Sequence, residues 1–134
     1  MSRKHSSHGT GEFTLDQFEQ VGKGVVIELG VLVFHPENIQ LGENVYVGHQ
    51  TIIKGYYKNK LKIGDNCWIG QQVFIHSAGG VEIHKNVGIG PGVKILTSTH
   101  SEEGCDKPII ESSLQSSPVI IEEDCDIGVN SVIL

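Results

Sequence analysis

The chain lacks the features that mark membrane, secreted and nucleic-acid-binding proteins. None of its apolar runs approaches the roughly 18 residues that a membrane span needs, and the polar start MSRKHSSHGTG has no apolar signal-peptide core. Acidic residues outnumber basic ones by 16 to 10 without any basic cluster, which argues against a nucleic-acid partner. We therefore expect a cytoplasmic protein that binds neither membranes nor nucleic acids.

Cysteine is also scarce, and its spacing does not indicate disulfide bonds. The chain has three cysteines, Cys67, Cys105 and Cys125, which do not make a disulfide framework. Cys67 and Cys125 occupy equivalent positions two coils apart in the repeat described below, roughly 9–10 Å at the usual strand spacing and too far for a bridge. We expect both to line the core of a reduced protein, and Cys105 to be an ordinary loop residue.

Aliphatic residues recur every six positions along most of the chain. Successive members of the series are six residues apart except at every third step, where the spacing widens to 8, 10, 8 and 26 residues. The series is Val21, Ile27, Val33, Leu41, Val47, Ile53, Ile63, Ile69, Ile75, Ile83, Ile89, Ile95, Ile121, Ile127 and Ile133. This pattern predicts an all-β chain folded as a parallel β-helix. Its coils would have three sides and about 18 residues, with every insertion at the same corner.

A second set of positions supports the coil prediction. Three residues after each regular aliphatic position the chain has mostly Gly, Asn or Asp, the residues that most readily adopt a positive φ. We expect these positions to form the tight corners between flat strands. They are Gly24, Gly30, Asn44, Gln50, Asn66, Gln72, Asn86, Gly92, Asp124 and Asn130.

The repeat divides the chain into a tail, a cap and a β-helix domain. Residues 1–12 are polar and without periodicity, and we expect a disordered tail in which His5 and His8 are solvated. Residues 13–20 are expected to form a short helical cap that closes the open end of the first coil. Residues 21–134 form one β-helix domain, with loop 96–120 inserted at one corner.

Two details of these boundaries can be tested against a structure. In the cap, Thr14 and Gln17 have capping-box spacing, and Leu15 and Phe18 are expected on one face. At the other end the repeat stops in a strand at Leu134, which would leave a bare sheet edge. We therefore expect further coils beyond this residue.

The widest insertion contains the candidate catalytic residue. His100 lies five residues after Ile95, in the 26-residue step. Histidine suits a general base because its usual pKa lies near neutral pH. Glu102, Glu103 or a loop carbonyl is expected to orient the ring.

Other residues are expected around this loop or at the surface. Stacking places His76 and Ser77 at the same corner one coil lower, where they are candidates for binding an acceptor. Backbone N–H groups around Gly88 and Gly90 are candidate donors to an oxyanion. The second insertion is expected to put two tyrosines at the surface. Surface positions are expected for His35, His49, His84, Tyr56 and Tyr57.

The repeats, with the segments IGPGVKILTSTH and VIIEEDCDIGVNSVIL, resemble the hexapeptide-repeat acyltransferases over residues 21–134. The closest likeness is to the sugar and xenobiotic O-acetyltransferases similar to maltose and galactoside acetyltransferases. The resemblance implies a left-handed parallel β-helix, a homotrimer and acetyl-CoA bound between subunits, with His100 as the catalytic base. It also implies cofactor binding through the backbone of Gly128, Val129 and Asn130, and acceptor binding near Gln72.

The chain departs from that family at two points. Members usually have Trp-Ile-Gly after the loop, where this chain has Asp126-Ile127-Gly128. The later turns that hold pantetheine and adenine in relatives do not follow. We therefore expect the chain as it stands to bind acetyl-CoA weakly or not at all.

Our leading hypothesis is an acetyl-CoA-dependent O-acetyltransferase that acts on a sugar or glycoconjugate precursor. One alternative is N-acetylation of a nucleotide-linked amino sugar. A second is a zinc carbonic anhydrase on the same fold, which needs three histidine ligands. The His-x4-His pair typical of such enzymes is absent, so we expect no metal site. A third is a non-catalytic assembly module, which would need neither the wide loop nor His100.

Overall fold

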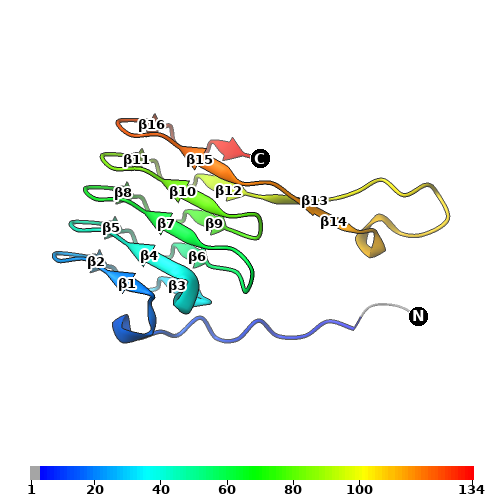
Figure 1. Cartoon of the computed structure of the whole chain (residues 1–134), viewed down its shortest axis with the longest axis horizontal. Helices are drawn as coiled ribbons and strands as arrows, with labels where there is room; N and C mark the ends of the chain where they lie inside the picture. The colour runs from blue at the N-terminus through cyan, green and yellow to red at the C-terminus, as the bar shows by residue number, and fades with distance from the viewer. Residues whose placement is uncertain (1–3) are drawn as a thin grey trace.

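The computed structural model describes residues 4–134, which form a three-sided β-solenoid made of three five-stranded parallel sheets (Figure 1). The first sheet consists of β1 (Gln20–Val21), β4 (Ile39–Leu41), β7 (Leu61–Ile63), β10 (Val81–Ile83) and β15 (Val119–Ile121). The second consists of β2 (Val26–Ile27), β5 (Tyr46–Val47), β8 (Trp68–Ile69), β11 (Gly88–Ile89) and β16 (Asp126–Ile127). The third consists of β3 (Leu32–Phe34), β6 (Ile52–Lys54), β9 (Phe74–His76), β12 (Lys94–Leu96) and β17 (Val132–Ile133). The predicted all-β, parallel β-helix class is confirmed.

The aliphatic series forms the core of the solenoid. Each six-residue step advances the chain to the next side, so equivalent residues stack in register from coil to coil. In the second sheet, for example, Val47 aligns with Ile69, and Ile69 with Ile89. The side chains of these residues are fully buried, and each such burial contributes about 1.5–3 kcal/mol. The core is therefore a continuous column of Ile, Leu and Val that runs the length of the solenoid.

The corner prediction is confirmed at all ten positions. Every predicted corner residue has a positive φ, between 54° at Asn44 and 82° at Gly30. Side chains at neighbouring corners bond to each other along the solenoid, as between Asn66 and Asn86. Close stacking of the coils also explains why position 48 is a glycine, because a Cβ there would lie 2.7 Å from the amide nitrogen of Gln71.

Every insertion lies at the corner between the third and first sheets, as predicted, and we call this the third corner. It holds residues 35–38, which include the 3₁₀ turn η2 (Pro36–Asn38), and then 55–60, 77–80 and 97–118. The last of these forms an arm of two strands, β13 (Ser98–His100) and β14 (Leu114–Ser116), with the 3₁₀ turn η3 (Ile109–Glu111). Figure 1 shows the arm reaching away from the solenoid on the side toward which the N-terminal segment also runs.

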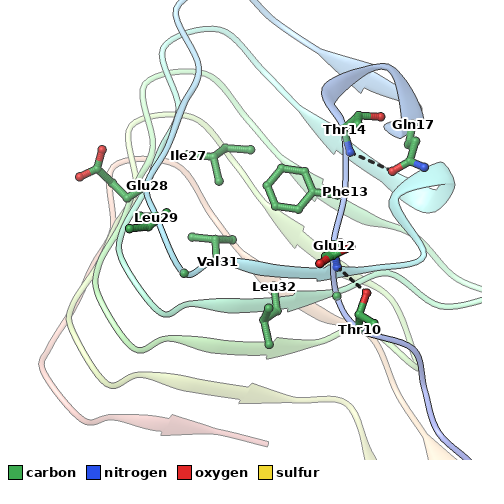
Figure 2. Close-up of a pocket in the computed structure, with 12 residues that line it drawn as sticks. Thr10, Glu12, Phe13, Thr14, Gln17, Ile27, Glu28, Leu29, Val31 and Leu32 are labelled. Atoms are coloured by element: carbon green, nitrogen blue, oxygen red, sulfur yellow. Dashed lines mark hydrogen bonds between the residues drawn. The ribbon is translucent and has the colours of Figure 1, made fainter.

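The segment that precedes the first coil closes the start of the solenoid. Its 3₁₀ turn η1 (Leu15–Gln17) is fixed by a 2.9 Å hydrogen bond from the backbone N–H of Thr14 to Gln17 Oε1. Residues 10–17 and the first coil line an open hollow of about 850 Å³, to which Ile27 and Val31 contribute (Figure 2). This cavity shares no lining residue with the arm, so we do not assign it to the His100 site.

The cap differs from its prediction in one respect. Phe18 is buried, with 7% of its surface exposed, whereas Leu15 is 53% exposed. The expectation that both share one face was wrong because the helical turn ends at Gln17 and Phe18 has extended backbone. The ring of Phe18 packs edge-on against Phe13 instead, with centroids 5.7 Å apart.

The tail and the cysteines can now be placed. Of the predicted tail 1–12, residues 1–3 lie outside the described residues, and residues 4–12 form neither helix nor strand.

Cys67, Cys105 and Cys125 are all free thiols, and Cys67 is buried in the core. None of the helical turns within residues 4–134 is long or apolar enough to cross a bilayer.

Candidate active site

The arm that carries His100 is an antiparallel pair. β13 and β14 align Ser98 with Ser116 and His100 with Leu114. Directly paired residues project from the same face of an antiparallel ribbon, so the side chains of His100 and Leu114 lie on one face of the arm. The base of the arm is bonded to the coil below, because Thr97 Oγ1 donates to the carbonyl of His76 at 2.7 Å. The arm is therefore held at a fixed place on the third corner.

His100 has the geometry of a general base. Its Nδ1 lies 3.0 Å from the carbonyl oxygen of Ser112, which accepts hydrogen bonds only, so Nδ1 must carry the proton. In the neutral ring this leaves Nε2 as the proton acceptor. Ser112 is buried, with 7% of its surface exposed, so its carbonyl is a constrained partner. Of the orienting groups left open by the sequence, the structure uses a loop carbonyl.

Glu103 has a different role, in holding the arm together. Its Oε1 accepts hydrogen bonds from Ser101 Oγ at 2.8 Å and from the backbone N–H of Ser113 at 3.0 Å. Its other oxygen pairs with Lys107. The ion pair with Lys107, followed by the hydrogen bonds with Ser113 and Ser101, holds the pKa of Glu103 far below its usual range. Because this pKa is depressed, the bonds to the carboxylate are present at neutral pH and are lost only in strong acid.

A cavity of about 470 Å³ lies against His100. Ile110 and Glu111 of the arm line one side, and the N-terminal segment lines the other through Lys4, His5, Ser6 and His8. The half-buried imidazole therefore faces a partly open pocket, in which a substrate can be held against it. His5 and His8, expected to be solvated, are both exposed, and both line this space.

His76 lines a second cavity, of about 460 Å³, beside the first. Its half-buried ring contacts the edge of Tyr56, with centroids 6.1 Å apart. Burial, with smaller effects of Lys54 and His8, holds the pKa of His76 below its usual value. Leu114 and His8 also line this cavity, so it adjoins the His100 site.

The other two predicted acceptor residues are not brought to this cavity. Ser77 has no exposed surface, and its Oγ donates to the carbonyl of Lys54 at 2.6 Å. Ser77 therefore stabilises the corner and has no surface for a substrate, which corrects the prediction for this residue. Gln72 lies at the other end of β9, where its Nε2 donates to Gln50 Oε1 at 3.1 Å. The structure does not place Gln72 beside His76.

The predicted cofactor residues lie at another corner of the solenoid. Gly128, Val129 and Asn130 connect β16 with β17, between the second and third sheets. Val129 is 65% exposed, and Ser131 Oγ donates to the Gly128 carbonyl at 2.8 Å. The arm leaves from the opposite end of the third sheet's strands, about 10 Å away for a three-residue strand. Within one chain these residues do not join His100 in a single pocket.

The predicted oxyanion donors are not available. The N–H of Gly88 donates to the Cys125 carbonyl at 3.0 Å, and that of Gly90 donates to the Ile127 carbonyl at 2.8 Å. Both groups belong to the ladder between coils four and five and lie on the second sheet. The prediction of Gly88 and Gly90 as oxyanion donors was therefore wrong.

The sequence analysis missed several residues that line the two cavities. Lys54 aligns with Phe34 on one side and with His76 on the other in the third sheet. The repeat register could therefore have predicted that Lys54 and Phe34 lie near His76. Tyr56, expected at the surface, is half-buried beside them. His35, His49 and His84 are exposed, as predicted. No local pattern indicates that the N-terminal segment returns to the arm.

Comparison with known proteins agrees with this architecture. A family model described as the hexapeptide repeat of succinyl-transferase matches residues 60–96 and 118–133, the coils on either side of the arm. A comparison with curated protein sequences gives no match. The matched residues thus resemble the hexapeptide repeats of that family, and they form coils of the three-sided parallel solenoid.

Two solved structures share the fold, and both are of point mutants of AntD, an N-acyltransferase from Bacillus cereus. The first holds dTDP-4-amino-4,6-dideoxyglucose and coenzyme A. It is 21% identical with a TM-score of 0.75, over 87% of this chain and 63% of its own. The second holds dTDP and coenzyme A, and is 20% identical with a TM-score of 0.76, over 93% of this chain and 71% of its own. The chain thus spans somewhat less than two thirds of the first structure.

Proposed function

We propose that the protein transfers an acyl group from acyl-coenzyme A, such as acetyl-CoA, to the amino group of a nucleotide-linked sugar, with His100 as general base. The observation that carries this proposal is the His100 ring, fixed through Nδ1 by the Ser112 carbonyl and facing a partly open pocket. The two similar structures are N-acyltransferases that hold coenzyme A, and one also holds an amino sugar nucleotide. They favour N-acylation, our alternative in the sequence analysis, over the leading hypothesis of O-acetylation.

The geometry of His100 suits this reaction. The acceptor amine attacks the thioester carbonyl, a C–N bond forms, and Nε2 of His100 takes the proton that the nitrogen must lose. The C–S bond then breaks, and the departing thiolate takes up this proton. The Ser112 carbonyl accepts the Nδ1 proton throughout and stabilises the ring while it is positively charged. No covalent intermediate with the enzyme is needed.

The choice of acceptor can be tested directly. We expect thiol release from acetyl-CoA in the presence of a nucleotide-linked amino sugar, and little with the matched sugar that has a hydroxyl in place of the amine. A thiol-reactive dye follows the reaction, and mass spectrometry identifies the product. Preferential acylation of the hydroxyl sugar would return the assignment to O-acetylation. Turnover of neither acceptor would oppose sugar nucleotides as the substrate class.

We also propose that the active enzyme is a homotrimer. His100 and the predicted cofactor residues Gly128, Val129 and Asn130 lie at different corners of one chain. A threefold arrangement can set the arm of one subunit against another corner of its neighbour, and binding sites often form at such interfaces. Light scattering is expected to give about three times the chain mass of 14.6 kDa. A stable monomer at assay concentration would oppose this proposal.

A further inference from the structure

The cavity beside His76 is unusually rich in basic side chains. His8 comes from the N-terminal segment, His35 from the third corner, Lys54 from β6 and His76 from β9. Within residues 4–134 no Asp or Glu lines this cavity, although the chain carries a net charge of −6. Four separate segments therefore converge to make one basic pocket in an acidic protein.

Lys54 is the central group of this pocket, and among the described residues it has no acidic partner. Three other lysines, Lys60, Lys85 and Lys107, each form an ion pair with a glutamate. The contacts of Lys54 are uncharged or basic: its Nζ donates to His8 Nδ1 at 3.1 Å and lies 5.2 Å from the centroid of the Phe34 ring. A partly buried ammonium group that lacks a carboxylate partner is stabilised when an anion binds to it.

The pocket also has apolar surface suited to a ring. Phe34, Tyr56 and Leu114 line it together with the basic groups. The rings of Tyr56 and His76 meet edge to face. Such a lining accepts the flat or apolar face of a sugar or base, while the basic groups hold a charged substituent.

The position of the pocket connects it with catalysis. Leu114, on its wall, is paired with His100 and projects from the same face of the arm. His8 lines both this pocket and the cavity at His100. The basic pocket therefore adjoins the cavity that His100 lines.

From this arrangement we propose that Lys54, His76 and His8 form a phosphate-binding subsite, which holds the diphosphate of the acyl acceptor while its sugar reaches His100. The anion site stands on the geometry of the pocket. Only its assignment to the acceptor rests on the proposed function. Coenzyme A also carries phosphates, so the experiment must separate the two sources.

The test is isothermal titration calorimetry of the full chain with three probes: inorganic pyrophosphate, thymidine diphosphate and coenzyme A. We expect both diphosphate probes to bind. Lys54→Met keeps the length and apolar stem of the side chain but removes its charge, and should weaken both by ~10–100-fold, the loss of one charge-assisted hydrogen bond. His76→Gln should weaken them in the same direction. Lys54→Arg should restore most of the affinity.

Two controls distinguish the subsite from general effects of charge and from catalysis. Lys94→Met removes a positive charge from the same sheet outside the pocket, and is expected to leave diphosphate affinity unchanged. His100→Ala is expected to lower turnover strongly but to keep diphosphate binding. Melting curves of each variant establish that it is folded.

Each outcome decides a separate point. Unchanged diphosphate affinity in folded Lys54→Met would overturn the subsite and leave the proposed activity standing. Loss of coenzyme A binding with thymidine diphosphate binding intact would assign the pocket to the acyl donor, and would overturn the acceptor assignment. Diphosphate binding that depends on Lys54, in a protein that acylates no sugar, would keep the anion site and reject the proposed function.

The pH dependence gives an independent check. Burial and the neighbouring Lys54 and His8 hold the pKa of His76 below its usual value. A bound anion favours the protonated ring, so binding should take up protons and become tighter from pH 8 to pH 6. The other ionisable groups that line the pocket are His35, which contacts Glu37 at 2.8 Å, and Tyr56. In His76→Gln this tightening should be reduced, and an unchanged profile would count against a role for His76.

Discussion

His100→Ala is expected to lower the turnover number by about 10²–10⁴, the usual effect of losing a general base. The effect should appear in the turnover number because Nε2 acts on the proton of the acceptor, whereas binding uses other groups. The affinity for acetyl-CoA should change little. Steady-state rates with saturating acetyl-CoA and a nucleotide-linked amino sugar measure this directly.

The same variant should remain folded. His100 lies on the arm and does not contribute to the aliphatic column of the solenoid, so its melting temperature should stay close to that of the unmodified protein. His84→Ala is a matched control, because this exposed histidine pairs with Glu82 and follows a strand of the first sheet, away from the arm. It should retain full activity. Near-full activity of His100→Ala, or its failure to fold, would show that the arm is structural and would remove the basis of the proposed mechanism.

The fold could be predicted almost completely because its two structural requirements, a buried aliphatic core and tight corners, both recur in the sequence every six residues. Inward positions require Ile or Val every six residues, and corners require residues that tolerate positive φ, as at Asn86 and Asp124. Both requirements are local and repeat in every coil. The position of the insertions could also be predicted, because every irregular spacing in the aliphatic series is a third step.

The site was less predictable because it depends on contacts between distant segments. His100 could be found from its position in the longest insertion. Its partner, the Ser112 carbonyl, is a backbone atom on the returning side of the arm and leaves no mark in the sequence. The contact between His8 and Lys54 joins residues 46 positions apart. Ser77 is buried and bonded to the coil below. The sequence alone does not show whether a polar corner residue makes such a bond or faces solvent.

The second large effect concerns the stability of the column. Ile89→Ala is expected to lower the free energy of unfolding by about 2–5 kcal/mol through the cavity that it leaves in the core. Ile89 has no exposed surface and lies between Ile69 and Ile127 in neighbouring coils. Little relaxation can fill the space, because the stacked backbone is fixed by hydrogen bonds such as that from Gly90 to Ile127.

Ile120→Ala provides the matched comparison, since it removes the same atoms from an outward-facing residue that is 57% exposed. We expect this change to cost about 0.5 kcal/mol or less. Urea unfolding followed by circular dichroism measures both values, and one protein concentration for all variants keeps any contribution from assembly equal among them. Because each coil is stabilised mainly by its neighbours, the change at Ile89 should lower the free energy of unfolding of the whole solenoid. Equal destabilisation by the two variants would mean that the inward column does not dominate the stability of this fold.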